Sequence, residues 1–246
     1  MIDNARAEAP RLDGYYWQTQ CPLHCMVFVL PMMLFFHLWG GDPFGSLKAV
    51  VDLTRILRFF GGTAAYLPPV AIMAVLLAQH LVRRDPWAIR PRVLLGMLIE
   101  SMAFVVPLVA IWHLMHKLAV LAASTGATAP TAGVFRKILE GTGAGIYEEF
   151  LFRLLAIGLA MIIFVDVFGL KKGWVALGTV IVTAVLFAAY HVGGERFAWG
   201  TLIFRTLAGV YLGGLFLLRG FGVAVGTHVM WNIYDALLLL AGNPQA

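Results

Sequence analysis

Charge is scarce in this 246-residue sequence: only 13% of the residues are Asp, Glu, Lys or Arg, whereas 61% are hydrophobic. A soluble domain of this length would carry roughly a quarter charged residues. The mean hydropathy of +0.84 agrees with this composition. The scarcity of charge excludes an ordinary soluble domain and indicates a protein that crosses a membrane several times. The net charge of +5 lies mostly in short loops beside apolar segments, so we expect no nucleic-acid partner.

Cysteine and serine are also rare. The two cysteines, Cys21 and Cys25, lie on either side of His24 and are too few for a disulfide framework. A metal site within this segment would need more ligands than it offers, so we interpret the cysteines as free thiols at the start of a span. None of the three serines follows the Gly-x-Ser pattern of a serine hydrolase.

Long apolar segments make up most of the remainder. Their length and composition predict an all-α, polytopic membrane helical bundle of about seven to eight transmembrane helices. An amphipathic helix over 47–60 is expected to lie in the membrane interface, and a short helix over 134–140 should end at the glycines of 141–145 unless it joins an eighth span. The seven predicted spans are 22–39, 63–82, 93–114, 146–170, 174–190, 201–218 and 221–240.

Three formal charges interrupt one of these apolar segments, in Glu148-Glu149-Phe-Leu-Phe-Arg153. A charge near the middle of a bilayer costs roughly 2.5–3.5 kcal/mol on insertion scales, so such residues are rare and usually functional. Glu149 and Arg153 are four residues apart on a helix and should form an ion pair. Glu148 points about a hundred degrees away and is free to face a cavity.

Two later spans carry polar pairs, in Phe187-Ala-Ala-Tyr-His191 and His228-Val-Met-Trp-Asn232. A carboxylate such as Glu148 and an imidazole can together take a proton from water, and a second imidazole with an amide can stabilise an oxyanion. The same residue types also suit a metal site of two histidines and one glutamate. Interhelical hydrogen bonding without catalysis is the third interpretation.

The order of these patterns on successive spans, Glu-Glu-x-x-x-Arg, then Phe-x-x-x-His, then His-x-x-x-Asn, resembles the CPBP family of CAAX proteases and bacteriocin-processing enzymes, also called the Abi family. The segment from Phe204 to Gly213 is similar to the glycine-bearing span that this family has between its two histidines. The resemblance covers about 141–240. It implies N-terminal spans and amphipathic connectors over 1–140 and a catalytic helical core over 141–246, within one integral membrane domain.

What the resemblance implies is an intramembrane endopeptidase that hydrolyses a peptide bond of a membrane-associated substrate, such as a prenylated CAAX-type protein or a sorting tag. Glu148 with His191 would activate the water. His228 and Asn232 would stabilise the oxyanion or help to hold a metal. The supporting residues would be Glu149, Arg153 and Phe187.

The resemblance fixes no cofactor, because the family includes enzymes described as metalloproteases and others described as glutamate-dependent. A divalent metal such as zinc would be held by Glu148, His191 and His228, from three separate spans, since the zincin spacing His-Glu-x-x-His is absent. The expected partners are a membrane-embedded or lipidated peptide or protein substrate and the lipid bilayer. The expected location is the plasma (inner) membrane of a prokaryote.

Other functions remain as alternatives. A non-proteolytic member of the same family would act as a scaffold or a bacteriocin-immunity protein. A proton-coupled transporter would also bury carboxylates and histidines, although the sequence shows no inverted repeat. An aspartyl intramembrane protease could use Asp235 and Asp166, but the sequence lacks a Gly-x-Gly-Asp motif.

Overall fold

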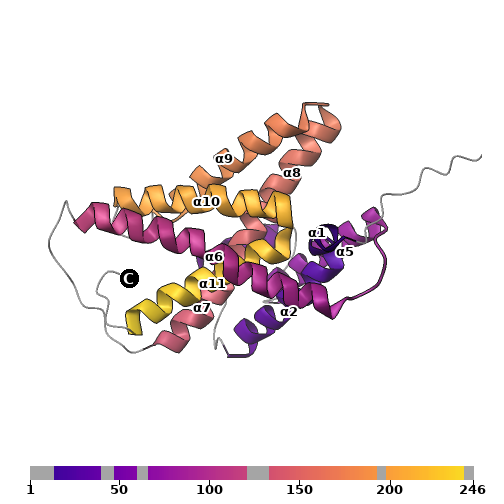
Figure 1. The fold of residues 1–246 in the computed structure, drawn as a ribbon. Coiled ribbons are helices and arrows are strands. Elements are labelled where there is room, and N and C mark those ends of the chain that lie inside the picture. The colour runs from indigo at the N-terminus through magenta and orange to yellow at the C-terminus, as the bar shows by residue number, and fades with distance from the viewer. Residues whose placement is uncertain (1–13, 40–46, 60–65, 121–132, 193–197, 241–246) are drawn as a thin grey trace, which may run out of the picture.

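The computed structural model describes residues 14–39, 47–59, 66–120, 133–192 and 198–240. Every regular element within these ranges is a helix, which confirms the predicted all-α class (Figure 1). The elements are α1 (Tyr15–Thr19), α2 (Pro22–Trp39), α4 (Lys48–Phe59), α5 (Leu67–Arg83), α6 (Pro91–Val120), α7 (Val134–Glu149), η1 (Phe150–Ile157), α8 (Gly158–Met161), η2 (Ile162–Val167), α9 (Lys172–Tyr190), α10 (Trp199–Arg219) and α11 (Phe221–Leu240).

Five helical stretches of the described chain are long and apolar enough to cross a membrane. The other two predicted spans are helical as well: α5 is apolar but only 17 residues long, and α11 has 20 residues and carries the last polar motif. The architecture is therefore a membrane helical bundle. The five stretches are Pro22–Trp39, Pro91–Met115, Val134–Val167, Lys172–Tyr190 and Trp199–Arg219.

The predicted helix break at residues 141–145 is wrong. Helix α7 runs through these glycines to Glu149, so 134–140 belongs to the motif helix and not to an eighth span. The physical reason is close packing against α11: a Cβ atom on Gly145 would lie 2.8 Å from Val229 Cγ2, and one on Gly141 would lie 2.8 Å from Asn232 Cβ. These glycines let two helices approach, and they do not end a helix.

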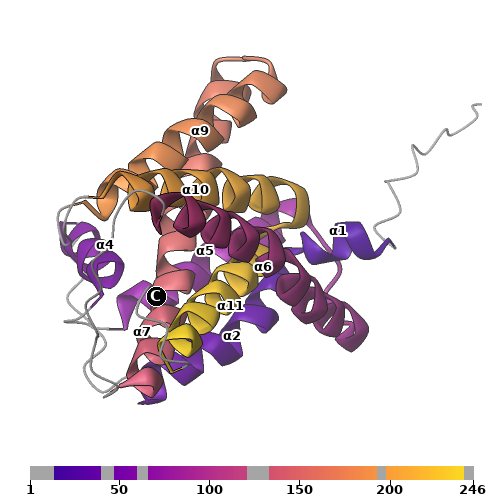
Figure 2. The same ribbon diagram turned by 60° about the vertical axis from the view of Figure 1, so that its left-hand side comes forward.

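The motif helix lies at the centre of the bundle. Helix α11 packs along α7 and α6, and α2 packs against α7 and α5. Helix α9 packs along α10, and together with α8 it forms a hairpin that projects away from the other helices in both views (Figures 1 and 2). The three predicted motifs therefore lie on α7–η1, α9 and α11, which meet beside α10.

Glycines on α10 allow the two motif-bearing layers to pack closely. A Cβ atom on Gly209 would lie 2.9 Å from the backbone of Ala184 in α9, and one on Gly213 would lie 3.1 Å from Val180. Both positions therefore serve close helix packing. Gly214 does not, because a Cβ atom there would meet nothing within 4 Å.

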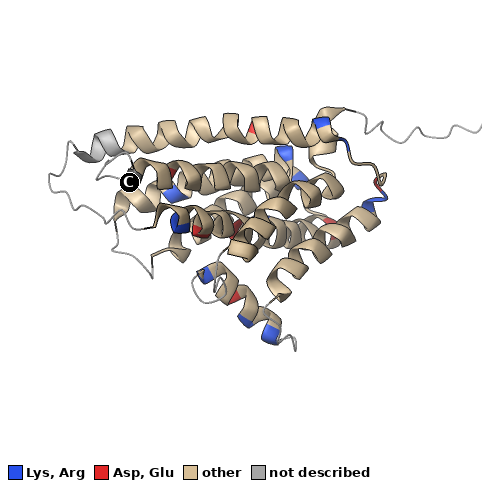
Figure 3. Cartoon of the chain, turned by 90° about the horizontal axis from the view of Figure 1, so that it is seen from below, with Lys and Arg blue, Asp and Glu red and all other residues tan. Residues whose placement is uncertain are grey.

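Few charges occur along the helices, and Lys and Arg gather where the chain turns between α5 and α6 (Figure 3). Glu100, which lies within the α6 span, pairs with Arg219 at the end of α10, with 2.7 Å between Oε1 and Nη2. This ion pair joins α6 to α10.

Candidate active site

The motif helix changes its hydrogen-bonding pattern at the charged residues. The α-helix α7 ends at Glu149, and the following turns, which contain Arg153, form the π-helix η1. π-Helical turns are rare and occur frequently at functional sites. Glu148, Glu149 and Arg153 are all buried, with 8%, 0% and 1% of their surface exposed.

The predicted ion pair is present, with Glu149 Oε1 2.9 Å from Arg153 Nη1. The guanidinium group also donates from Nη2 to the backbone oxygen of Gly209 in α10 at 3.4 Å. It lies 4.7 Å from the ring centre of Phe187 in α9, a cation–π contact. Arg153 therefore fixes the motif helix against both neighbouring helices.

Glu148 lies between the two predicted histidines. Its Oε1 is 3.3 Å from His191 Nε2, and its Oε2 is 3.8 Å from His228 Nε2. Glu148 and His191 are 43 positions apart in sequence, and His191 and His228 are 37 apart. The structure thus brings together three polar side chains from three helices.

The other nitrogen of each imidazole faces a hydrogen-bond acceptor. His191 Nδ1 donates to the backbone oxygen of Phe187 at 2.9 Å, and His228 Nδ1 donates to Glu149 Oε1 at 2.8 Å. A carbonyl or carboxylate oxygen can only accept, so each Nδ1 carries a proton. Both rings therefore present Nε2 to Glu148. In catalytic and metal-binding histidines, a hydrogen-bond acceptor at one ring nitrogen commonly fixes the ring in this way.

Asn232 lies one turn after His228 on α11. Its Nδ2 donates one hydrogen bond, of 2.8 Å, to the backbone oxygen of Gly141. The amide nitrogen has a second N–H group, and the side chain lines the same cavity as Glu148. Asn232 is therefore positioned by α7 and keeps a donor for a ligand.

These side chains line a cavity of about 600 Å³. One wall is aromatic: the ring centres of Trp112 and Phe204 are 5.2 Å apart, and those of Phe204 and Trp231 are 5.0 Å apart. Lys137 and Arg205 add positive charge to the lining. The cavity thus combines a polar end with an apolar wall, as ligand sites usually do.

Some features of the site escaped the sequence analysis. The bond from His228 to Glu149 was not expected, although a buried carboxylate that needs partners was a signal for it. Trp112 and Lys137 were given no role, and their positions outside the motifs gave no signal. Phe150, within the first motif, lies in the hydrophobic core with 1% exposure.

Residues 130–234 match the family model described as type II CAAX prenyl endopeptidase Rce1-like. This segment is similar to the CAAX protease family, in agreement with the resemblance of its motifs. No curated protein and no solved structure matches the chain in the two other comparisons. The match contains all three motifs, from Glu148 to Asn232.

The match agrees with the helical architecture, which is that of an integral membrane protein. The predicted metal ligands are Glu148, His191 and His228, and the glutamate is the residue that lies close to each histidine. Their ligand atoms do not all lie within 4.8 Å of one another, a spacing that one other cluster of the described residues does meet.

Proposed function

We propose that this protein is a CAAX-type intramembrane endopeptidase in which Glu148 and His191 activate a water molecule. The observation that carries the proposal is the position of the Glu148 carboxylate between Nε2 of His191 and Nε2 of His228. Because His191 Nδ1 already donates to a backbone oxygen, its Nε2 can accept a proton from water held at Glu148. The hydroxide then attacks the peptide carbonyl carbon. The C–N bond breaks as the proton taken from the water passes to the leaving amine nitrogen.

His228 and Asn232 are proposed to stabilise the resulting oxyanion. To donate to the oxyanion, His228 needs a proton on Nε2 in addition to the one on Nδ1, which faces the Glu149 carboxylate. The second N–H group of Asn232 Nδ2 would supply another donor. Removing one donor of an oxyanion hole typically lowers kcat by about 10²- to 10³-fold.

The substrate is proposed to be a membrane-associated peptide with an apolar or prenylated segment near its C-terminus. The aromatic wall of Trp112, Phe204 and Trp231 suits such a segment. Lys137 and Arg205 in the same lining suit a terminal carboxylate. We further propose the plasma membrane of a prokaryote as the location, which membrane fractionation would test.

A metal-dependent form of the reaction is the alternative. In that form Glu148, His191 and His228 would be the ligands, and a bound divalent ion such as zinc would make its water more acidic. These residues would then have to move closer together than they lie here.

The test is cleavage of a prenylated CAAX peptide by purified protein in lipid nanodiscs, followed by mass spectrometry. Glu148→Gln keeps the shape of the side chain but cannot hold the proton, so we expect activity to fall by about 10²-fold or more. The matched control is Glu140→Gln on the same helix, where the carboxylate pairs with Arg136 on an exposed face. Cleavage at the wild-type rate by a folded Glu148→Gln protein would refute the proposal.

A further inference from the structure

A second group of metal-ligand side chains lies outside the active-site cavity. Cys21 follows α1, His80 lies in the last turn of α5, and Asp85 lies just after that helix. All three are buried, with 7%, 0% and 5% of their surface exposed. Their ligand atoms lie within 4.8 Å of one another. Packing has thus brought together a thiol, an imidazole and a carboxylate from segments about 60 residues apart in sequence.

The spacing of two of these atoms is close to that of a metal site. Ligands bound to one zinc ion at about 2.3 Å (sulfur) and 2.0–2.1 Å (nitrogen) lie roughly 3.6 Å apart when the geometry is tetrahedral. Cys21 Sγ and His80 Nδ1 are 3.9 Å apart. A contraction of a few tenths of an ångström would place both on the same ion.

The buried polar groups also lack a full set of partners. His80 Nε2 is fully buried and has no hydrogen-bond partner, while the ring packs edge to face with Trp87 at 4.3 Å. Asp85 contacts one cation, with 3.0 Å from its Oδ2 to Arg83 Nε. Burying such groups is costly unless they are paired or coordinate a metal. An ion would stabilise the Asp85 carboxylate and, through Nδ1, the His80 ring, while His80 Nε2 would stay without a partner.

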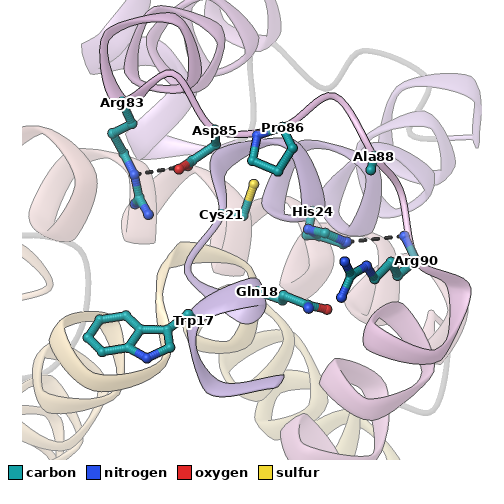
Figure 4. A pocket seen from close by; sticks show the side chains of 9 residues that line it. All are labelled: Trp17, Gln18, Cys21, His24, Arg83, Asp85, Pro86, Ala88 and Arg90. Atoms are coloured by element: carbon teal, nitrogen blue, oxygen red, sulfur yellow. Dashed lines mark hydrogen bonds and ion pairs between the residues drawn. The ribbon is translucent and has the colours of Figure 1, made fainter. Parts of the chain in front are cut away.

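There is room for a further ligand beside the cluster. Cys21 and Asp85 line a small cavity of about 60 Å³, with the Cys21 sulfur and the Asp85 carboxylate on the same side (Figure 4). A water molecule occupies about 30 Å³, so the cavity has room for one that can serve as a fourth ligand. His24 and Arg90 line the opposite end, where the Arg90 backbone nitrogen donates to His24 Nε2.

We propose that Cys21, His80 and Asp85 bind a divalent transition-metal ion of the zinc type, with a water molecule completing the coordination. The thiolate and imidazole select such an ion over magnesium or calcium. Cys21 releases its proton as the ion binds, so that a thiolate and the Asp85 carboxylate, which already pairs with Arg83, face the ion. The ion would join the α1–α2 turn to the end of α5, and so stabilise the N-terminal half of the bundle rather than act on the substrate.

The test uses Co²⁺ as a spectroscopic probe on detergent-purified protein carrying Glu148→Gln, His191→Ala and His228→Ala, so that the active-site cavity cannot contribute. We expect about one equivalent of Co²⁺ to bind, with a thiolate-to-cobalt charge-transfer absorption in the near ultraviolet that Zn²⁺ abolishes. Cys21→Ser and His80→Gln should lose this absorption. Cys25→Ser, which removes the other thiol of the chain, should keep it.

A second measurement needs no variant and therefore tests the site even if the variants fail to fold. In the wild-type protein, Zn²⁺ should slow alkylation of Cys21 at least tenfold, as read by mass spectrometry of the peptides. The absence of a charge-transfer band in the folded parent protein would overturn the proposal. So would a band that survives Cys21→Ser, or alkylation of Cys21 at the same rate with and without Zn²⁺. None of these outcomes depends on peptidase activity, so they leave the proposed catalytic function untouched.

Discussion

His228 donates from Nδ1 to Glu149 Oε1 across 2.8 Å, although the two residues are 79 positions apart. The same carboxylate oxygen lies 2.9 Å from Nη1 of Arg153. Glu149 is therefore more than the helix support that its spacing from Arg153 suggests. It connects the ion pair that holds the motif helix to the histidine that faces Glu148.

We expect Glu149→Ala to be strongly destabilising. It leaves the Arg153 guanidinium buried without its counterion, and removing one partner of a buried ion pair typically costs about 3–5 kcal/mol. Glu149→Gln retains an oxygen that accepts from His228 and should be less destabilising, yet still lower kcat because His228 loses the negative charge beside its Nδ1. Thermal unfolding in nanodiscs with parallel kcat measurements checks both. Equal stability of Glu149→Ala and wild type would contradict this role.

Gly141→Ala should impair catalysis without touching a catalytic side chain. The added Cβ would lie 2.8 Å from Asn232 Cβ, so α7 and α11 must separate or Asn232 must turn. Overpacking of this kind costs typically 1–3 kcal/mol. We expect kcat to fall by roughly tenfold, less than the 10²- to 10³-fold effect of deleting an oxyanion donor.

The control for this prediction is Gly158→Ala, at the start of α8. A Cβ atom there would meet nothing within 4 Å, and alanine favours helix by about 1 kcal/mol over glycine. Gly158→Ala should therefore keep full activity and gain slightly in stability. If the two alanine variants behave alike, the packing argument for Gly141 fails.

Lys137→Gln should weaken binding of substrates that end in a free carboxylate. Lys137 lines the cavity but is exposed, and an exposed ion pair is worth up to ~1 kcal/mol, or about a fivefold change in KM. An amidated peptide of the same sequence lacks the carboxylate and should show no change. Comparison of KM for the two peptides checks this, and an equal effect on both would argue against carboxylate binding.

Chelation should leave peptidase activity intact in the glutamate form of the mechanism. The experiment is best done with Cys21→Ser, so that loss of an ion from the proposed structural site does not destabilise the protein. Activity after treatment with a chelator, together with elemental analysis, gives the answer. Loss of activity that Zn²⁺ restores would favour Glu148, His191 and His228 as metal ligands instead.

The sequence by itself determined the class of the molecule and the composition of its site. Scarce charge and long apolar segments are enough for an all-α membrane bundle, because a bilayer admits few other structures. The i, i+4 spacing of Glu149 and Arg153 was sufficient for their ion pair, since helix geometry is local. The order of the three motifs singled out Glu148, His191, His228 and Asn232.

Only the tertiary structure decided which side chains meet across helices. The contacts of His228 with Glu149, of Glu100 with Arg219, and of Cys21 with His80 depend on how the helices rotate and cross. The course of the helix through the glycines of 141–145 was likewise decided by tertiary packing. A glycine run weakens an isolated helix. Here α7 continues through all of them, because Gly141 and Gly145 pack against α11 and Gly143 packs against Phe36 and Leu47, and packing energy outweighs local propensity.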